Sequence, residues 1–311
     1  MINYKRLLVV IDPEHENQAA LARACLIAQA TKAKIKAVMC IYDFSYEMTT
    51  MLSIDERNAM KTAVIKERTE WLSRVIAPFQ DSFSDTDIIS YDVIWDNRSH
   101  EAFIKTGVAN QSDLIIKATK SHEGLASLIF TPTDWHLLRK APFPVLLVKP
   151  HDWPINGNII AALNIGTDDQ QHNNLNTKIA NVAKNYAELL DANVYLTNSF
   201  PGTPVNIAIE IPEFDPAGHT AAVQQHHQIE MQKFAQLHDI TDSCCVVKQG
   251  LPEIVIPATA EILDAELVVI GCLGRVGISA ALIGNTAEQV IDSLNCDVLA
   301  IKPEGFASPI N

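Results

Sequence analysis

Three glycines near the C-terminal end are spaced as in a loop that could hold an anion. Residues 271 to 290 read GCLGRVGISAALIGNTAEQV, and they follow directly after the apolar run LVVI. Glycine lets backbone N–H groups approach an anion closely, and the N-terminus of a following helix favours negative charge. The loop is therefore a candidate phosphate site that contains Gly271, Gly274 and Gly284.

Five apolar runs of strand length alternate with helical segments in each half of the chain. The runs are LLVVI, KIKAVMCI, IISYDVIW, DLIIKA and PVLLV in the first half, and NIIAALNI, NVYLTN, SCCVVKQ, ELVVI and DVLAI in the second. Continuously apolar strands that alternate with helices are typical of parallel sheets covered on both faces. The predicted fold class is therefore α/β, with two tandem doubly wound (Rossmann-like) domains that each have a mainly parallel sheet of about five strands.

The two halves are copies of one domain. Residues 113 to 150 align with residues 266 to 303 without a gap, and the closing VLLVKP of the first segment meets VLAIKP of the second. This match indicates an internal duplication. The stretch PHDWPINGN, residues 150 to 158, interrupts all periodicity, so we expect domains at residues 1 to 150 and 156 to 303.

A capping box predicts where one long helix begins. The sequence SIDE starts at Ser53, and a serine followed by glutamate three residues later satisfies the first backbone N–H groups of a helix. Met60, Val64, Trp71 and Val75 then recur at helical spacing. These four side chains are expected to form the apolar face of the helix.

Composition limits the classes of partner. The 311 residues carry a formal net charge of -13 with a pI near 5.2 and no basic run, which argues against nucleic acid or an anionic membrane as a partner. The N-terminal apolar run LLVVI is too short to span a bilayer, so we expect a buried strand in a cytoplasmic protein. The six cysteines show no C-x-x-C spacing, which favours reduced thiols over disulfides or zinc ligands.

The second half carries a motif that resembles the universal stress protein family. In that family the fourth strand runs into G-x2-G-x9-G and a small polar residue, and here Gly271, Gly274, Gly284 and Asn285 match it. Residues 250 to 271 also look like the family's approach to strand four. The resemblance covers nearly the whole chain as two tandem domains.

The resemblance implies a non-catalytic stress-response protein with a site for ATP or another adenine nucleotide. Loop amides would contact the phosphates, a hydroxyl would follow the last glycine, and an acid after strand one would lie near the adenine. Asn285 takes the hydroxyl's position and Asn164 the acid's, and each Asn still offers a donor and an acceptor. The cofactor-binding residues implied are Asn164, Ile270, Gly271, Gly274, Gly284, Asn285 and Thr286.

The resemblance also implies how the two halves associate. In the family the last strand of the domain is an edge that commonly pairs with its counterpart, and VLLVKP and VLAIKP offer two such edges in one chain. Two edge strands that pair with each other are no longer exposed, which protects them from aggregation. We therefore expect an internal pseudo-dimer, with a homo-oligomer or a protein partner as further possibilities.

The first half departs from the family pattern. Asp12 stands where the adenine-facing acid belongs, and with the following Pro13 it is expected to end a strand and begin a helix. The loop itself has lost its glycines, and proline follows, which has no N–H to give a phosphate. The substituted positions are Ala118, Ser121, Thr131 and the adjacent Pro132. We expect no nucleotide here and a structural or regulatory role.

Other interpretations stay open for three features. Asn285 can simply cap the helix TAEQVIDSL. Residues 200 to 216, FPGTPVNIAIEIPEFDP, form either a loop packed on its own domain or an extended lid over an apolar ligand, and their IAIEIP strip, residues 207 to 212, also suits a protein scaffold. Histidines crowd residues 219 to 238, but His227 shares a face with apolar neighbours, which favours the edge of a core over a zinc site. Slow nucleotide hydrolysis is less favoured, because neither G-x4-G-K-[ST] nor G-x-S-x-G occurs.

Overall fold

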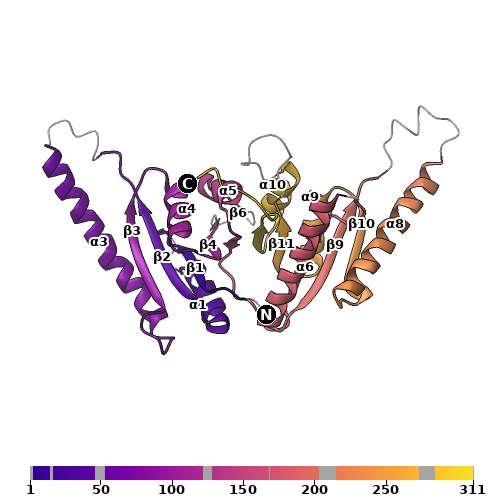
Figure 1. Ribbon diagram of the computed structural model, residues 1–311, viewed down its shortest axis with the longest axis horizontal. Coiled ribbons are helices and arrows are strands. Elements are labelled where there is room, and N and C mark those ends of the chain that lie inside the picture. The colour runs from indigo at the N-terminus through magenta and orange to yellow at the C-terminus, as the bar shows by residue number, and fades with distance from the viewer. Residues whose placement is uncertain are drawn as a thin grey trace. The chain divides into compact units, whose positions relative to one another are not determined.

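The chain folds into two compact units, each with its own sheet (Figure 1). In the computed structural model the described residues are 3–14, 17–45, 53–121, 128–167, 169–202, 215–272 and 284–310. The first domain consists mainly of Asn3–Lys120 and Phe130–His151, and the second mainly of Asp152–Ala307. From Ser308 onward the chain belongs to the first domain again, where Ser308 Oγ donates a hydrogen bond to the Lys140 carbonyl at 2.7 Å.

The first domain has a five-stranded parallel sheet in the order β7-β4-β1-β2-β3. Its strands are β1 (Arg6–Val10), β2 (Lys34–Ile41), β3 (Ile89–Trp95), β4 (Leu114–Ala118) and β7 (Val145–Val148). Its helices are α1 (Ala19–Thr31), α3 (Ile54–Gln80), α4 (Ser99–Ala109) and α5 (Pro132–Lys140). Two short strands, β5 (Lys120–Ser121) and β6 (Leu128–Ile129), pair with each other outside this sheet.

The second domain repeats this arrangement with the strand order β10-β9-β8-β11-β12. Its strands are β8 (Asn158–Leu163), β9 (Asn193–Phe200), β10 (Cys245–Gln249), β11 (Ala265–Gly271) and β12 (Asp297–Ile301). Its helices are α6 (Gln170–Leu190), α8 (Pro216–Leu237), α9 (Pro252–Ile262) and α10 (Asn285–Ser293), with the short 3-10 helix η1 (Asp242–Cys244) before β10.

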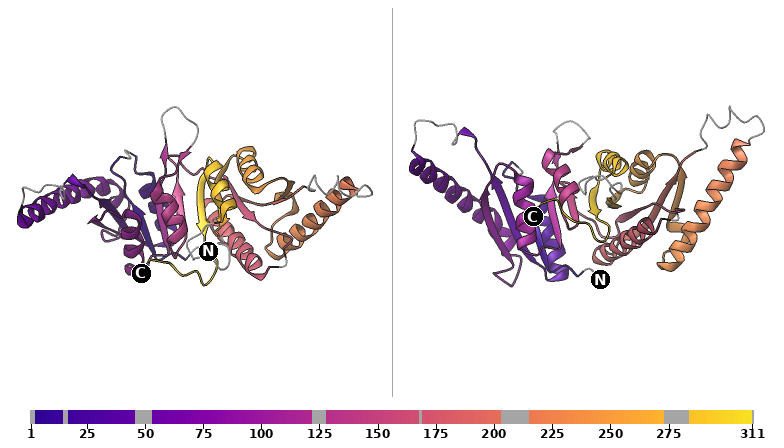
Figure 2. Two further views of the ribbon diagram at one scale, coloured as in Figure 1. Left: turned by 90° about the horizontal axis from the view of Figure 1, so that it is seen from above. Right: turned by 45° about the horizontal axis from the view of Figure 1, so that its top comes forward.

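Helices cover both faces of each sheet (Figures 1 and 2). Right-handed crossovers place α1 and α3 on one face of the first sheet and α4 and α5 on the other, and these pairs pack together. In the second domain α6 and α8 share one face, and α9 packs beside α10 on the other. The central strands are buried on both faces, as continuously apolar runs require. The predicted fold class is confirmed.

Helix α3 tests two expectations from the sequence, its capping box and its apolar face. Ser53 and Glu56 form the predicted capping box at the start of α3, but the predicted apolar face is only partly buried, with Val64, Trp71 and Val75 half-buried. Met60 is 42% exposed, whereas Leu72 and Ile76 are the buried side chains of α3. Spacing identifies apolar positions, but it does not show how far a helix of this length extends beyond the sheet that covers it.

Asp12 and Pro13 do not begin a helix, so that expectation is wrong. β1 ends at Val10, and the Asp12 carboxylate then accepts a hydrogen bond from the Glu14 N–H at 3.0 Å. This is a local turn of the kind that Asp side chains favour, and α1 begins later, at Ala19. Within the described parts of the chain, no helix is both long and apolar enough to cross a membrane.

Candidate functional site

A pocket of about 380 Å³ lies in the second domain, where β8 and β11 end and α10 begins. Ligands of doubly wound folds bind at this end of the sheet, and the volume lies within the range of about 300 to 1,000 Å³ that is usual for small-molecule sites. Six of the seven implied cofactor-binding residues line it, and Gly274 lies outside the described residues. The six are Asn164, Ile270, Gly271, Gly284, Asn285 and Thr286.

The N-terminus of α10 is open toward this pocket. Gly284 is the N-cap residue, with φ 86°, and it makes no side-chain cap. The Glu288 N–H bonds the Gly284 carbonyl at 3.2 Å, which leaves the amides of the three residues before it without a partner inside the helix. The interpretation of Asn285 as the helix cap is wrong, because Asn285 is already the first helical residue. Asn285 is among the residues that line the pocket.

Gly271 has a packing role that its place in the glycine motif did not reveal. A Cβ atom at Gly271 would lie 2.5 Å from Leu175 Cδ2 and 3.1 Å from Ile179 Cδ1. Both of these side chains belong to α6, which packs on β11. Glycine at the end of β11 therefore lets α6 approach the strand closely, whatever binds beside it.

Asn164 is held at the pocket wall by a second asparagine. The Asn164 N–H donates to Asn176 Oδ1 at 3.0 Å, and Asn176 Nδ2 donates to the Asn164 carbonyl at 2.8 Å. Asn176, on α6, is only 2% exposed, so its buried side-chain amide has little freedom to move. This pair of bonds orients the backbone of Asn164, a residue that lines the pocket.

Sequence reasoning missed the wall that α6 contributes. His172, Leu175, Asn176 and Ile179 line the pocket from one face of this helix, and their helical spacing is the signal that could have found them. Among the described lining residues is His172, whose ring hydrogen-bonds the Asp169 carboxylate. Further lining residues are Ala162, Leu163, Ser199, Pro252, Ile256, Ala287 and Val290.

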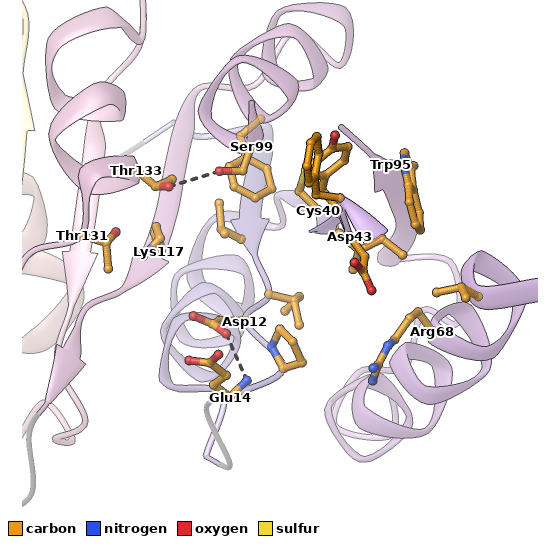
Figure 3. A pocket seen from close by; sticks show the side chains of 18 of the residues that line it. Asp12, Glu14, Cys40, Asp43, Arg68, Trp95, Ser99, Lys117, Thr131 and Thr133 are labelled. Atoms are coloured by element: carbon orange, nitrogen blue, oxygen red, sulfur yellow. Dashed lines mark hydrogen bonds between the residues drawn. The ribbon is translucent and has the colours of Figure 1, made fainter. Parts of the chain in front are cut away.

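The first domain has a larger and more charged cavity, of about 910 Å³ (Figure 3). Carboxylates from the strand ends and from α3 line it, and Lys117 and Arg68 also contribute. The carboxylates are those of Asp12, Glu14, Asp43 and Glu67. This cavity was not expected from the sequence, where the lost glycines predicted that no nucleotide binds here. Its acidic lining disfavours a phosphate group.

A buried ion pair replaces part of the pocket in the first domain. Lys117 Nζ lies 2.7 Å from Asp134 Oδ1, and their side chains are only 6% and 0% exposed. In the gap-free alignment of the two halves, Lys117 takes the place of Ile270 and Asp134 that of Ala287. Both of those second-domain residues line the second-domain pocket.

Helix α5 of the first domain has its N-terminus closed by a capping box. Asp134 Oδ2 accepts the Thr131 N–H at 2.6 Å, and Thr131 Oγ1 accepts the Asp134 N–H at 3.3 Å, which completes a capping box. Pro132 occupies the first turn and has no N–H. The N-termini of α5 and α10 thus differ chemically: the first is capped by a buried carboxylate, and the second is open to the pocket.

The other candidate features contribute no site that the structure describes. Among the described residues, no group of three or more His, Cys, Asp and Glu side chains is placed to hold a metal ion. The strip at residues 207 to 212 lies outside the described residues. His227 lies beside the buried Met231 on α8, and its ring stacks on Phe200, which agrees with a position at the edge of the core.

The chain is similar over its whole length to known proteins. The model of the Universal stress protein family matches residues 3–149 and 165–302. Universal stress protein E of Salmonella typhi and of Escherichia coli K12 is 45% identical over 311 residues, which cover 100% of this chain and 98% of each relative. A crystal structure of a universal stress protein from Pseudomonas aeruginosa UCBPP-PA14 is 30% identical with a TM-score of 0.72, covering 97% of this chain and 95% of that chain.

Proposed function

The chain belongs to the universal stress protein family, and from that membership we propose that it is a non-catalytic, cytoplasmic stress-response protein whose second domain binds an adenine nucleotide. The observation that carries the proposal is the open N-terminus of α10. Its first residues line the pocket and no described side chain caps them, whereas the equivalent helix of the first domain is closed by the Thr131–Asp134 capping box. Free helix amides favour an anionic group such as phosphate.

The proposed ligand spans the pocket from Asn164 to α10. The Asn164 amide offers a donor and an acceptor to the adenine ring. Leu175, Ile179 and Ile256 supply apolar walls for the base and the sugar, as is usual in nucleotide-sized sites. The phosphates then lie against the first turn of α10, where Thr286 contributes a hydroxyl.

A second candidate ligand is an apolar small molecule or an apolar segment of a protein partner. It is favoured by the predominance of neutral and aliphatic side chains among the described lining residues. Catalysis is not proposed for either ligand, because the described lining offers no lysine and no carboxylate, and its one histidine, His172, is hydrogen-bonded to Asp169. The first domain is proposed to have a structural or regulatory role.

The identity of the co-purified ligand distinguishes these candidates. Freshly purified full-length protein is denatured, and the released small molecules are analysed by mass spectrometry. An adenine nucleotide in near-stoichiometric amount supports the first candidate, whereas a lipid-like mass supports the second. Steady release of phosphate from added ATP, above a denatured control, would contradict the non-catalytic role.

The substitution Asn164→Asp is expected to change ATP affinity by no more than about tenfold. Asn already offers a carbonyl acceptor to an adenine amino group, so a charged acceptor adds only about 0.5 to 1.5 kcal/mol. Calorimetric titration with ATP measures the effect, and Asn295→Asp adds the same charge at an exposed position between α10 and β12. A gain of several hundredfold at Asn164 alone would show that the asparagine had disabled the site.

The internal pseudo-dimer stays a prediction, and it can be tested with the second domain alone. Residues 156 to 311 are expected to self-associate, because the β12 edge is then left without its proposed partner. Light scattering during size-exclusion chromatography gives the mass of the particle. A folded, soluble monomer with no tendency to dimerise would contradict this packing.

A further inference from the structure

A third asparagine, Asn198, fixes the turn that carries Asn164. Asn198, on β9, is fully buried, and its Oδ1 accepts the N–H of Ile165 at 2.9 Å. Its Nδ2 lies 3.1 Å from Nδ1 of His227, on α8. The three residues form a relay from α8, through β9, to the residue next to Asn164.

The direction of these hydrogen bonds determines the protonation state of His227. A backbone N–H can only donate, so the Asn198 atom facing Ile165 must be the carbonyl oxygen. The Asn198 NH₂ group, also a donor, therefore faces His227. His227 Nδ1 can complete the relay only as an acceptor, and it accepts only when that nitrogen carries no proton.

The ring of His227 also fits tightly against the turn. It stacks on Phe200 with the ring centroids 5.4 Å apart and the planes 18° apart. A Cβ atom at Gly166, where φ is +88°, would lie 2.7 Å from Cε1 and 2.8 Å from Nδ1 of the ring. The imidazole therefore has little room to turn away when the polarity of its bond to Asn198 is reversed.

We propose that His227 is a positioning residue for the second-domain pocket: its neutral ring holds the turn at Asn164 in the binding geometry, and protonation of the ring releases that turn and weakens ligand binding. The inference rests on the proposed function for its ligand, although the relay itself is independent of the ligand. It assigns a regulatory input, proton concentration, to the site.

The electrostatic surroundings of His227 agree with a neutral ring. Burial lowers the pKa of His227, the neighbouring His226 lowers it further, and the Ile165 carbonyl acts in the opposite direction. His226 is the titratable neighbour on α8, with its ring centroid 5.7 Å away, and the groups on β9 that face the ring, Asn198 and Phe200, are neutral. The relay is therefore intact at neutral pH and is lost as the pH falls through the lowered pKa.

The test compares the pH dependence of ATP binding in the full-length protein and in three variants. From about pH 7.5 to about pH 5, wild-type affinity is expected to fall about five- to tenfold more than that of His227→Gln, whose amide oxygen accepts from Asn198 without titrating. His227→Leu removes the acceptor, so it should bind weakly at every pH. The matched control, His226→Gln, should keep the extra loss of affinity at low pH, with its midpoint moved to higher pH because the neighbouring charge is removed.

Titration of ATP itself is common to all four proteins, so only the differences between their pH profiles bear on His227. Equal profiles for wild type and His227→Gln would overturn the inference while leaving nucleotide binding intact. If the wild type binds no ATP at any pH, the proposed function fails instead. The amide resonance of Ile165 in NMR spectra then tests whether the relay exists. This resonance must shift with the titration of His227 in the wild type and stay constant in His227→Gln. Any other result overturns the relay.

Discussion

Replacing Gly284 by valine is expected to weaken ATP binding about thirty- to a hundredfold while the protein stays folded. Gly284 has φ 86°, a conformation that a β-branched residue rarely adopts, and it immediately precedes the open first turn of α10. A shift of this residue displaces two or three backbone donors from the ligand, at about 1 kcal/mol each. Calorimetry with ATP and thermal unfolding are to be measured on the same preparation.

Gly305→Val is the matched control for the backbone strain. Gly305 also has a positive φ, 76°, but a Cβ atom there would meet nothing within 4 Å, and the residue lies outside the pocket. This variant is expected to bind ATP as the wild type does. If Gly284→Val remains folded and binds ATP equally well, the glycine serves only the turn into α10, and the role proposed for it in phosphate binding is wrong.

The substitution Asp134→Ala is expected to destabilise the first domain by about 3 to 5 kcal/mol. It leaves the Lys117 ammonium, with a side chain only 6% exposed, without its carboxylate in a buried site. It also removes the capping box of α5. Urea denaturation, monitored by a spectroscopic signal that comes from the first domain, gives the free energy of unfolding of that domain.

The second domain suggests the variant that should restore stability. Lys117→Ile combined with Asp134→Ala installs the residues found at the equivalent positions, Ile270 and Ala287. An apolar pair replaces a buried ion pair at little cost, so only about 1 kcal/mol should remain, from the lost cap. If the double variant is no more stable than Asp134→Ala alone, the buried charge is not the cause.

An exposed ion pair provides the control for charge removal itself. Asp92 pairs with Lys36 on the first sheet, but its side chain is 58% exposed. Asp92→Ala is therefore expected to cost less than about 1 kcal/mol, because water screens the pair in the native state. An equal cost for Asp92→Ala and Asp134→Ala would contradict the importance given to burial.

The strands could be predicted from the sequence because each carries its own signal. The apolar runs at β1, β8, β11 and β12 are uninterrupted, and a strand buried on both faces requires little else. Local chemistry also predicted the start of α3, because Ser53 and Glu56 bond to each other's backbone without help from the rest of the chain. Signals contained in a few consecutive residues are thus readable before the fold is known.

The parts of the site that escaped prediction depend on contacts between distant segments. Asn176 and Asn198 are ordinary polar residues in the sequence, and only the fold brings them to the backbone of Asn164 and Ile165. The cap assigned to Asn285 failed for a related reason, since Gly284 already provides the turn into α10. The ion pair between Lys117 and Asp134 could have been predicted, because the gap-free alignment of the two halves places both residues opposite apolar ones.

The residues from Ser308 onward are synthesised after the second domain but belong to the first. From Ser308 onward the chain rejoins that domain, and Ser308 binds the carbonyl of Lys140 at the C-terminal end of α5. Domains generally fold in the order of their synthesis, but here the earlier domain lacks its final segment until the later one has been made. A nascent chain arrested just before Ser308 therefore carries all the residues of the second domain beside a first domain that is still incomplete.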